Sequence, residues 1–542
     1  MTIPTTPRPV IWSIAGTDSV GGAGLAADQR AAEAFGVHLC PVVAAVTAQN
    51  SRAVTQVQPV SPDLLDAQLD ALAQDLPPLV IKTGLLGGSA QVAVVARWVD
   101  RLRARGPLAL VVDPVLGAST GASFADLQTV DAYRRELLPR ATVITPNRGE
   151  AARLLGLADA APQDLPGLAR ALQAAGAQSA CITGGDSADL AGLVLDWMAT
   201  PQADGWLALP RVATAHSHGT GCTFASSVAA ALALGFVPAD ALVLAKMATT
   251  HALRRGYPAG QGRGPVAASA GFANVPELLP ALSWGDHSDF SHWRVAPASG
   301  AAPQPDLGLY AIVDSAARVS QVLQAGVRTV QLRIKTPAVP DAAWQAQLAE
   351  AIRQSVASAQ AHGARLFIND HWRLAGALGA PAVHLGQEDL LALDDAGRTE
   401  LLASGLQLGI SSHSLWELAR ARTLAPAYVA CGPVWPTLTK DMPWRPQGLD
   451  NLAWWCAVAG VPVVAIGGIL SAEQMTLAAR SGASAVCAVR VLGENPCATV
   501  PVLQQALERG RALAHQLPVP ALPHPSLASP FGVPVDGLPQ RR

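Results

Sequence analysis

Charged side chains are scarce in this sequence, and neither sign dominates. Asp, Glu, Lys and Arg make up 14% of the 542 residues, with 40 acidic and 38 basic side chains. No block of Lys and Arg with interleaved aromatic residues occurs, so the electrostatic footprint of a nucleic-acid partner is missing. Half of the residues are hydrophobic, yet no uninterrupted apolar run is long enough to cross a membrane. We therefore expect a well-packed protein that acts on small molecules, without nucleic-acid or membrane partners.

Cysteines are few and dispersed. The seven cysteines occur singly and without CxxC spacing, which argues against a disulfide framework and a structural zinc site and fits a cytoplasmic location. Residues 1–9 contain Thr and Pro but no basic region followed by an apolar one, so they predict a disordered lead-in rather than a secretory signal. The sequence does not define the oligomeric state, and a homo-oligomer stays open.

The chain is too long for one hydrophobic core, which predicts at least two domains. Residues 10–282 alternate short apolar runs with helical stretches rich in Ala and Leu, indicating an α/β domain with a mainly parallel sheet. This periodicity stops over residues 283–306, which read as a linker. A second alternating domain is predicted for residues 307–516, followed by a disordered Pro-rich tail over residues 517–542.

Eight short apolar runs with strand character follow one another in the second domain. They begin near Leu309, Val330, Arg365, Ala382, Gln407, Tyr428, Val463 and Ala485. Eight such units alternating with helices predict a TIM (β/α)8 barrel, whose active site lies at the carboxyl ends of the strands. Polar residues or glycines close or follow six of the runs, at Asp314, Arg333, Asn369, Ser411, Gly432 and Gly467.

Two segments of the first domain have features of a binding site. The glycine-rich turn G-T-D-S-V-G-G-A-G, which ends at Gly24, admits a ligand close to the backbone, although tight packing explains it equally well. The segment His218–Thr223, H-G-T-G-C-T, precedes an apolar helical stretch, and its amides suit a transferring phosphoryl group. The helix dipole is expected to lower the pKa of Cys222 and make its thiol a base, and a buried structural cysteine is the alternative.

Other polar groups stand at the ends of predicted strands. They are Gln49 in T-A-Q-N, Asp113 in V-D-P-V and Glu150 in T-P-N-R-G-E. The Glu suits Mg²⁺, directly or through water, while a helix cap or a turn is the alternative for each of them.

Together these segments resemble the ribokinase-like family, and specifically the hydroxymethylpyrimidine/phosphomethylpyrimidine kinases, over about residues 10–266. The resemblance rests on A-G-T-D-S-V-G-G-A-G, T-A-Q-N, K-T-G-L-L, V-D-P-V, T-P-N-R-G-E, H-G-T-G-C-T and G-R-G-P-V. It implies a ribokinase-like α/β sandwich that phosphorylates hydroxymethylpyrimidine twice, with ATP as co-substrate. The implied roles are the pyrimidine site for Asp28 and Gln49, the hydroxymethyl contact for Cys222, Mg²⁺ binding for Asp113 and Glu150, and the anion hole for Gly219 and Gly221.

One position departs from this family pattern. Where the family often has a Lys before a glycine pair, the chain has Thr183 before Gly184 and Gly185. A threonine hydrogen-bonds phosphate but cannot neutralise its charge. We therefore expect Lys82 or Arg148 to compensate.

The second domain also carries polar groups in a regular pattern. Gln331, Arg333 and Lys335 alternate along the second predicted strand, so they are expected on one side, where three donors suit a diphosphate. A solvated strand end is the alternative for such a pattern. Asp370 and Asp389 follow the next two strands, where they are able to share one Mg²⁺ or to cap the following helices.

Residues 307–492 closely resemble the thiamine-phosphate synthases. The motifs Q-L-R-I-K, I-N-D, H-L-G-Q-E-D, G-x-S-x-H, G-P-V-x-P-T-x-T-K and A-I-G-G-I occur in family order. The resemblance implies that hydroxymethylpyrimidine diphosphate loses pyrophosphate and that the nitrogen of thiazole phosphate captures the resulting cation.

The same resemblance implies a role for each polar group of the barrel. The groups implied to stabilise the diphosphate are Arg333, Lys335, Lys440 and Mg²⁺ on Asp370 and Asp389. The pyrimidine and the diphosphate are implied to be positioned by Gln331, Asn369 and Ser411. The thiazole phosphate is implied to be bound by Thr437, Thr439, Gly467 and Gly468. Arg490 stands where the family commonly has Ser. We expect it to clamp the thiazole phosphate, with a surface position as the alternative.

The two resemblances fit one pathway, because the product of the kinase is the substrate of the synthase. Two alternatives stay open. In the first alternative, the N-terminal half is a pyridoxal-type kinase. In the second, the chain is a non-catalytic sensor of pyrimidine or thiamine phosphate.

Overall fold

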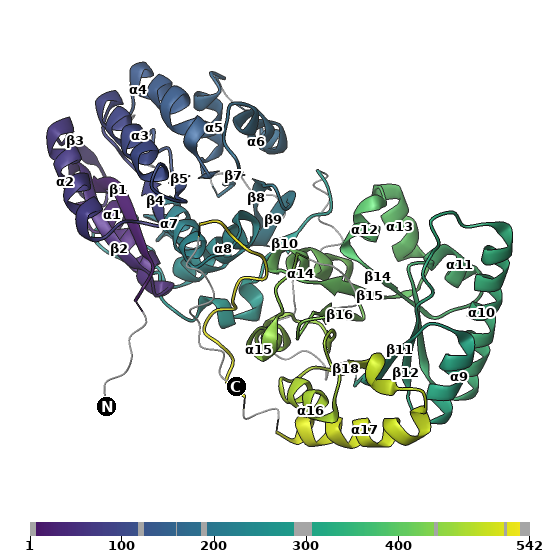
Figure 1. The fold of residues 1–542 in the computed structure, drawn as a ribbon. Coiled ribbons are helices and arrows are strands. Elements are labelled where there is room, and N and C mark those ends of the chain that lie inside the picture. The colour runs from purple at the N-terminus through teal and green to yellow at the C-terminus, as the bar shows by residue number, and fades with distance from the viewer. Residues whose placement is uncertain are drawn as a thin grey trace, which may run out of the picture. The chain divides into compact units, whose positions relative to one another are not determined.

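The computed structural model describes residues 7–117, 124–158, 160–185, 192–286, 306–437, 443–513 and 517–531. The chain divides into two compact units. The first comprises Met1–Phe290 with Leu527–Arg542, and the second comprises Ser291–Ser526. Figure 1 shows the helices and strands of both units.

The first unit is built on a ten-stranded sheet in the order β10-β9-β8-β7-β6-β5-β4-β1-β2-β3. Six strands from β7 to β2 pair in parallel, while β3, β8, β9 and β10 pair antiparallel at the two ends. The strands are β1 (Val10–Thr17), β2 (His38–Gln49), β3 (Val54–Pro59), β4 (Val80–Thr83), β5 (Ala109–Val112), β6 (Val143–Ile144), β7 (Ala180–Ile182), β8 (Leu193–Ala199), β9 (Asp204–Pro210) and β10 (Ala281–Leu282).

Helices cover both faces of this sheet (Figure 1). One group contains α1 (Gly24–Ala34), α7 (Thr220–Ala233) and α8 (Pro238–Arg254), which pack against one another. The other group consists of α2 (Pro62–Asp75), α3 (Ser89–Arg103), α4 (Leu127–Ala132), α5 (Arg148–Leu154) and α6 (Leu165–Ala174). Strands β4 and β5 are buried along their whole length, as expected for parallel strands covered on both faces.

The second unit is a closed barrel of eight parallel strands, in which β11 pairs with β18. Its strands are β11 (Gly308–Val313), β12 (Thr329–Leu332), β13 (Arg365–Asn369), β14 (Ala382–Leu385), β15 (Gln407–Ser412), β16 (Tyr428–Cys431), β17 (Val463–Ala465) and β18 (Ala485–Ala488). The predicted TIM barrel is confirmed, and every strand begins within one residue of its predicted start. Its helices are α9 (Ala316–Gln324), α10 (Ala342–Ala361), α11 (Trp372–Ala377), α12 (Gln387–Ala392), α13 (Asp395–Ala403), α14 (Leu415–Ala421), α15 (Gly448–Val458), α16 (Ala472–Arg480) and α17 (Pro496–Ala512).

Three predicted non-regular segments are more ordered than expected. In the lead-in, Arg8 forms an ion pair with Glu33 at 2.9 Å. At the start of the predicted linker, the indole of Trp206 donates a hydrogen bond of 2.9 Å to the carbonyl oxygen of Asp286, so the first unit continues past residue 282. Prediction of a disordered tail is wrong for its first part, because His524 and Ser526 are hydrogen-bonded to the barrel. Lack of periodicity did not reveal these single anchoring contacts.

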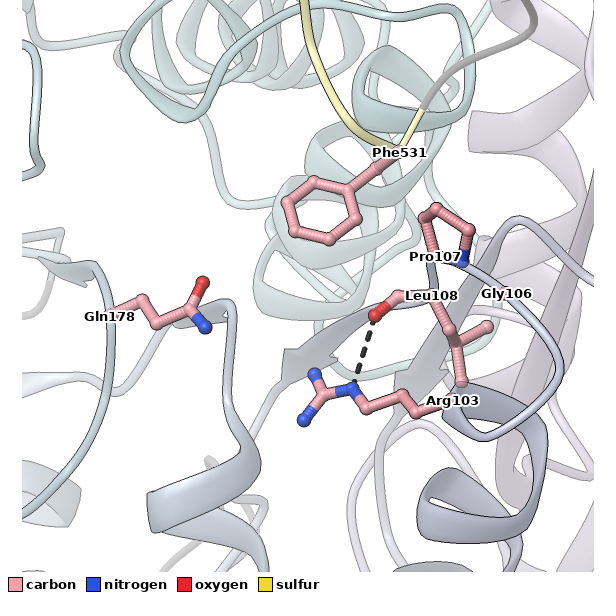
Figure 2. Close-up of a pocket in the computed structure, with 6 residues that line it drawn as sticks. All are labelled: Arg103, Gly106, Pro107, Leu108, Gln178 and Phe531. Carbon is pink, nitrogen blue, oxygen red and sulfur yellow. Dashed lines mark hydrogen bonds between the residues drawn. The ribbon is translucent and has the colours of Figure 1, made fainter.

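An open depression of about 310 Å³ lies at the amino ends of β5 and β7 in the first unit. Figure 2 shows its lining residues, Arg103, Gly106, Pro107, Leu108, Gln178 and Phe531. The guanidinium of Arg103 is held by the carbonyl oxygen of Leu108 at 3.2 Å. This depression is at the opposite ends of the strands from the predicted site residues. Across the described parts of the chain, no helix has both the length and the apolar character needed to span a membrane.

Candidate active sites

The carboxyl edge of the first sheet gathers the strand-end residues predicted from the sequence. Gln49 ends β2, Asp113 follows β5, and Asn147 follows β6. Thr183 follows β7 and forms a parallel bridge with Asn147. Because these strands run parallel, the residues that follow them lie along one edge of the sheet.

The glycine-rich turn after β1 is held together by Asp18. Its carboxylate accepts hydrogen bonds of 2.8 to 3.0 Å from the amides of Val20, Gly22 and Ala23, and its Oδ2 lies 2.8 Å from Nε2 of His218. Burial tends to raise the pKa of Asp18, but the hydrogen bonds from His218 and the backbone lower it overall. These three amides are therefore engaged within the protein, which favours a packing role for this part of the turn.

The start of α7 packs against that turn. Gly219 has φ +85°, and a Cβ atom there would lie 2.0 Å from the carbonyl oxygen of Gly22, so only glycine fits. Gln49 reaches the same place, with its Nε2 3.4 Å from Nε2 of His218. Gly221 is exposed with open space around its Cα. The structure thus brings Gln49, Gly219 and Gly221 to one helix start.

The predicted pKa shift of Cys222 is wrong in direction. Burial raises the pKa of Cys222 to about 12; Lys82 offsets part of this rise, while Asp28 and Asp113 add to it. The helix dipole and the nearby Gly24 amide do not overcome the loss of solvent. At neutral pH the residue is a thiol, so it is a poor base in the ligand-free protein.

A buried ionic cluster lies beneath this helix start. Asp28 is fully buried, and its carboxylate accepts hydrogen bonds from Lys82 at 3.0 Å, Ser13 at 2.6 Å and Ser226 at 2.8 Å. Burial opposes the charge of Lys82, but Asp28 and other nearby groups raise the pKa of Lys82 overall. The position of Asp28 argues against direct contact with a pyrimidine. Lys82 has no solvent exposure either, so it does not compensate for Thr183 as expected.

Asp113 has one free oxygen beside this cluster. Its Oδ2 lies 3.8 Å from Nζ of Lys82 and has no hydrogen-bond partner among the described residues, although Asp113 is only 5% exposed. Burial raises the pKa of Asp113 to about 6, with Lys82 opposing this shift. A buried carboxylate oxygen without a partner is suited to a cation.

Glu150 adopts the alternative role considered from the sequence. It forms a capping box at the start of α5, with its Oε2 accepting a hydrogen bond of 3.0 Å from the amide of Asn147. Its Oε1 accepts a longer bond of 3.4 Å from the amide of Leu116. The carboxylate is only half-buried, so contact with a metal through water is compatible with its capping role.

In the second unit, β12 ends at Leu332, one residue before Arg333. The predicted alternation therefore stops early: Gln331 is buried inside the barrel, whereas Arg333 and Lys335 follow the strand and are exposed at its carboxyl end. The Gln331 amide donates a hydrogen bond of 2.7 Å to Oδ1 of Asn369, which joins two of the predicted site residues.

These two amides form one end of a buried chain of hydrogen bonds across the barrel. Tyr310 Oη donates to Oε1 of Gln331 at 3.2 Å and lies 2.7 Å from Oη of Tyr428. His384 continues the chain, with its Nδ1 2.8 Å from Oη of Tyr428 and its Nε2 2.8 Å from Oγ of Ser411. Sequence reasoning gave no role to Tyr310, Tyr428 or His384. Their inward positions on separate strands were the only available signal.

The donors and acceptors in this chain of hydrogen bonds are fixed in one direction, because each hydroxyl has only one proton to donate. Tyr310 gives its proton to Gln331, so it must accept from Tyr428, which in turn accepts from Nδ1–H of His384. Burial lowers the pKa of His384 to about 4, with Arg333 and His413 acting in the same direction. His384 is therefore neutral, and its free Nε2 accepts a hydrogen bond from Ser411. Ser411 keeps its oxygen lone pairs available.

Two carboxylates meet at the mouth of the barrel. Burial and the neighbouring Asp389 raise the pKa of Asp370, and His371 and Arg333 partly oppose this rise. Asp370 also has φ +64°, an uncommon conformation for a residue other than glycine. Asp389 caps α12 by accepting a hydrogen bond of 2.9 Å from the amide of Gly386, and its side chain is exposed. The carboxylates are thus close enough to interact while Arg333 lies nearby.

The glycine pair after β17 has a backbone conformation that other residues rarely adopt. Gly467 and Gly468 have φ +90° and +74°. Side chains would clash there, since a Cβ at Gly467 would lie 2.7 Å from Pro433 and one at Gly468 would lie 2.6 Å from the carbonyl oxygen of Trp435. Thr437 follows Trp435 in the loop after β16, and Arg490 is exposed just beyond β18. Thr439 and Lys440 lie outside the described residues.

Family comparisons agree with this division of the chain. A phosphomethylpyrimidine kinase family matches residues 18–267, and a thiamine monophosphate synthase family matches residues 309–492. The probable thiamine biosynthetic bifunctional enzyme of Oryza sativa subsp. japonica, named as chloroplastic, is 32% identical over 85% of this chain and 81% of its own length. The chain belongs to the family of bifunctional thiamine biosynthetic enzymes. It combines a ribokinase-like kinase unit with a TIM-barrel synthase unit.

Other relatives match the kinase unit alone. The hydroxymethylpyrimidine/phosphomethylpyrimidine kinase of Synechococcus elongatus is 40% identical over 48% of this chain and 96% of its own length. A structure of Bacillus subtilis pyridoxal kinase in an ADP complex is 29% identical, with a TM-score of 0.45, and covers 48% of this chain and 98% of that one. The pyridoxal-type alternative is not favoured, because the matching family and the relative that spans most of the chain are enzymes of thiamine synthesis.

Proposed function

We propose that the chain uses ATP to phosphorylate hydroxymethylpyrimidine twice and then couples the diphosphate with thiazole phosphate, giving thiamine phosphate and pyrophosphate. The observation that carries this proposal is the presence of a polar strand end in each unit, where carboxylates are combined with positive-φ glycines that we propose to bind phosphate oxygens. A non-catalytic sensor has no need for both. The cytoplasmic location remains a prediction.

In the kinase unit, Gln49 is proposed to bind the pyrimidine, and Gly219 and Gly221 to bind the phosphoryl oxygens in transfer. The substrate hydroxyl forms a bond to the γ-phosphorus while the bond to the leaving ADP breaks, and the hydroxyl proton passes to an oxygen of the transferred phosphoryl group. Such loose transfer needs little early proton removal. Cys222, with its pKa raised to about 12, therefore orients the hydroxymethyl group rather than deprotonating it. Asp28 supports this site through Lys82 and Ser226.

The residues present in each unit fit Mg²⁺. In the kinase unit, the unpartnered Oδ2 of Asp113 is the candidate direct ligand, and Glu150 is a candidate through water. In the synthase unit, Asp370 and Asp389 form the candidate pair. Bound Mg²⁺ would neutralise phosphate charge in either unit.

In the synthase unit, Arg333, Lys335 and Lys440 are proposed to stabilise the diphosphate as it leaves, since its negative charge grows as the bond to carbon breaks. Gln331, Asn369 and Ser411 position the pyrimidine ring. The thiazole nitrogen then forms the new bond to that carbon.

Thr437, Thr439, Gly467 and Gly468 are proposed to bind the thiazole phosphate. Arg490 is proposed to add a positive charge beside them, because it lies exposed at the carboxyl end of the last strand. Formation of a homo-oligomer remains a prediction.

A split assay tests the two sites separately. Asp113→Asn is expected to lower phosphorylation of hydroxymethylpyrimidine by roughly a hundredfold or more and to leave the synthase rate unchanged when the diphosphate is supplied. Asp370→Asn is expected to lower the synthase rate by a similar factor and to leave phosphorylation of hydroxymethylpyrimidine unchanged. The exposed Asp131→Asn and Glu473→Gln serve as matched controls in the two units. Unchanged turnover in both site variants would support the sensor instead.

A further inference from the structure

The C-terminal segment beyond the barrel contacts a loop of the synthase site. It follows the last barrel helix, and its described residues are 517–531. His524 pairs with the side chain of Asn451 through two hydrogen bonds: the His524 amide donates to Oδ1 at 2.8 Å, and Nδ2 donates to the His524 carbonyl oxygen at 3.0 Å. Pro523, Pro525 and Ser526 are buried around this contact.

The same segment also holds the residues just before α15. Nε2 of His524 donates a hydrogen bond of 2.8 Å to the carbonyl oxygen of Gln447, and the carbonyl oxygen of Ser526 accepts one of 2.8 Å from the amide of Arg445. Gln447 is fully buried, and its side-chain oxygen accepts a third bond, of 3.0 Å, from Asn451. The C-terminal segment therefore contacts Gln447 directly through His524 and indirectly through Asn451, which His524 also binds.

Gln447 in turn holds the loop against which the glycine pair packs. The backbone amide of Gln447 donates a hydrogen bond of 2.7 Å to the carbonyl oxygen of Pro433. The backbone amide of Trp435 donates one of 3.1 Å to the carbonyl oxygen of Gly467. A Cβ atom at Gly467 would lie 2.7 Å from Pro433, which shows how closely the two backbones approach. A displacement of Gln447 is therefore transmitted to Gly467 through two hydrogen bonds and a close backbone contact.

We propose that the segment of residues 517–526 is a positioning element of the synthase, which fixes the phosphate-binding glycine pair through Gln447. This inference rests on the proposed binding of thiazole phosphate by that pair. The flanking prolines restrict the backbone of His524 before it docks, so little conformational entropy is lost when the contact forms. His524 acts through Gln447 and does not itself contact the substrate.

Steady-state kinetics of the full-length enzyme test this proposal. His524→Ala removes the bond to Gln447 and is expected to raise the KM for thiazole phosphate about three- to tenfold, the equivalent of one hydrogen bond, with kcat within roughly twofold. His524→Gln keeps an N–H donor and is expected to restore part of the loss. Val519→Ala changes an exposed residue of the same segment and is expected to have no effect. Phosphorylation of hydroxymethylpyrimidine serves as the internal control for each protein.

Thr437→Val separates failure of this proposal from failure of the phosphate site. If this variant raises the KM for thiazole phosphate and His524→Ala does not, the segment has no positioning role although the site assignment stands. If neither variant changes the KM, the site assignment fails, and the positioning role fails with it.

Hydrogen exchange on the unmodified enzyme avoids any dependence on a variant that fails to fold. Coupling between two sites is reciprocal. Saturating thiazole phosphate is therefore expected to slow amide exchange both in residues 443–451 and in residues 517–526. Slower exchange at the loop without any change in the C-terminal segment would overturn the proposal.

Discussion

The two candidate sites are supported by buried polar groups of opposite kinds. Beside the kinase site the buried groups are charged, with Lys82 between Asp28 and Asp113. Beside the synthase site they are neutral, and hydrogen bonds run from Ser411 through His384 and two tyrosines. Charge is compensated by opposite charge in the first case. Each donor meets one acceptor in the second.

This difference has consequences for stability and for chemistry. Removing one partner of a buried ionic cluster leaves an uncompensated charge, which costs more than an unpaired neutral group. These neutral hydrogen-bonded groups suit the proposed synthase reaction, because a protonated His384 beside Ser411, which is proposed to position the pyrimidine, would repel the cation. The kinase reaction passes through no such cation, and the ionic cluster lies beneath glycines that are proposed to bind phosphate.

Burial beside the ionic cluster is expected to have its largest measurable effect on Cys222. A pKa raised from 9.0 to about 12 lowers the thiolate fraction at neutral pH roughly a thousandfold, so iodoacetamide should alkylate this residue about that much more slowly than a free thiol. Mass spectrometry of peptides after timed labelling measures the rate. Cys497 is exposed and provides the internal comparison. Rapid labelling of both cysteines at pH 7 would contradict a raised pKa for Cys222.

Loss of Lys82 is the next largest effect. Lys82→Met keeps much of the side-chain volume but leaves Asp28 buried without its cation, so the free energy of unfolding of the kinase unit should fall by about 3–5 kcal/mol. Denaturant unfolding measures this change. Arg8→Met is the matched control, since it breaks an exposed ion pair with Glu33, for which at most about 1 kcal/mol is expected. Equal losses in the two variants would remove the distinction between buried and exposed charge.

Acid should weaken the synthase unit through His384. The pKa of His384 is about 4 in the folded protein, against 6.5 for a histidine side chain in water, so the unfolded state binds more protons between these values. The stabilising contribution is present above pH 6.5 and is lost as the pH falls toward 4, by on the order of 3 kcal/mol. Unfolding measured at several pH values tests the slope. His384→Asn should flatten it, and an unchanged slope would place the titration elsewhere.

The sequence was sufficient to predict the barrel but not the contacts inside it. Strand starts follow from local apolar runs, and all eight of them were predicted to within one residue. Tyr310 and Tyr428 are 118 positions apart and meet only after the barrel closes. The family resemblance assigned Asp28 to the substrate, and its burial was not foreseen because its partners Lys82 and Ser226 come from distant segments.

Prediction from local sequence patterns also failed where a segment without periodicity is held by one specific tertiary contact. The tail has the composition of a disordered segment, yet the side chain of Asn451 pairs with the backbone of His524. Likewise, the start of a helix suggested a low pKa for Cys222, but burial depends on neighbours from other strands. Both features are tertiary, so no window of sequence contains the necessary information.

The smallest expected effect concerns the neutral hydrogen-bonded groups of the synthase unit. Tyr428→Phe removes a hydroxyl that accepts from Nδ1–H of His384 and donates to Tyr310, so the free energy of unfolding should fall by about 1–3 kcal/mol. The synthase rate should fall as well, because the orientation of Ser411 depends on His384, while phosphorylation of hydroxymethylpyrimidine stays unchanged. Tyr257→Phe at an exposed tyrosine should change stability by less than about 0.5 kcal/mol. If Tyr428→Phe costs as much as Lys82→Met, neutral and charged burial do not differ in the way proposed.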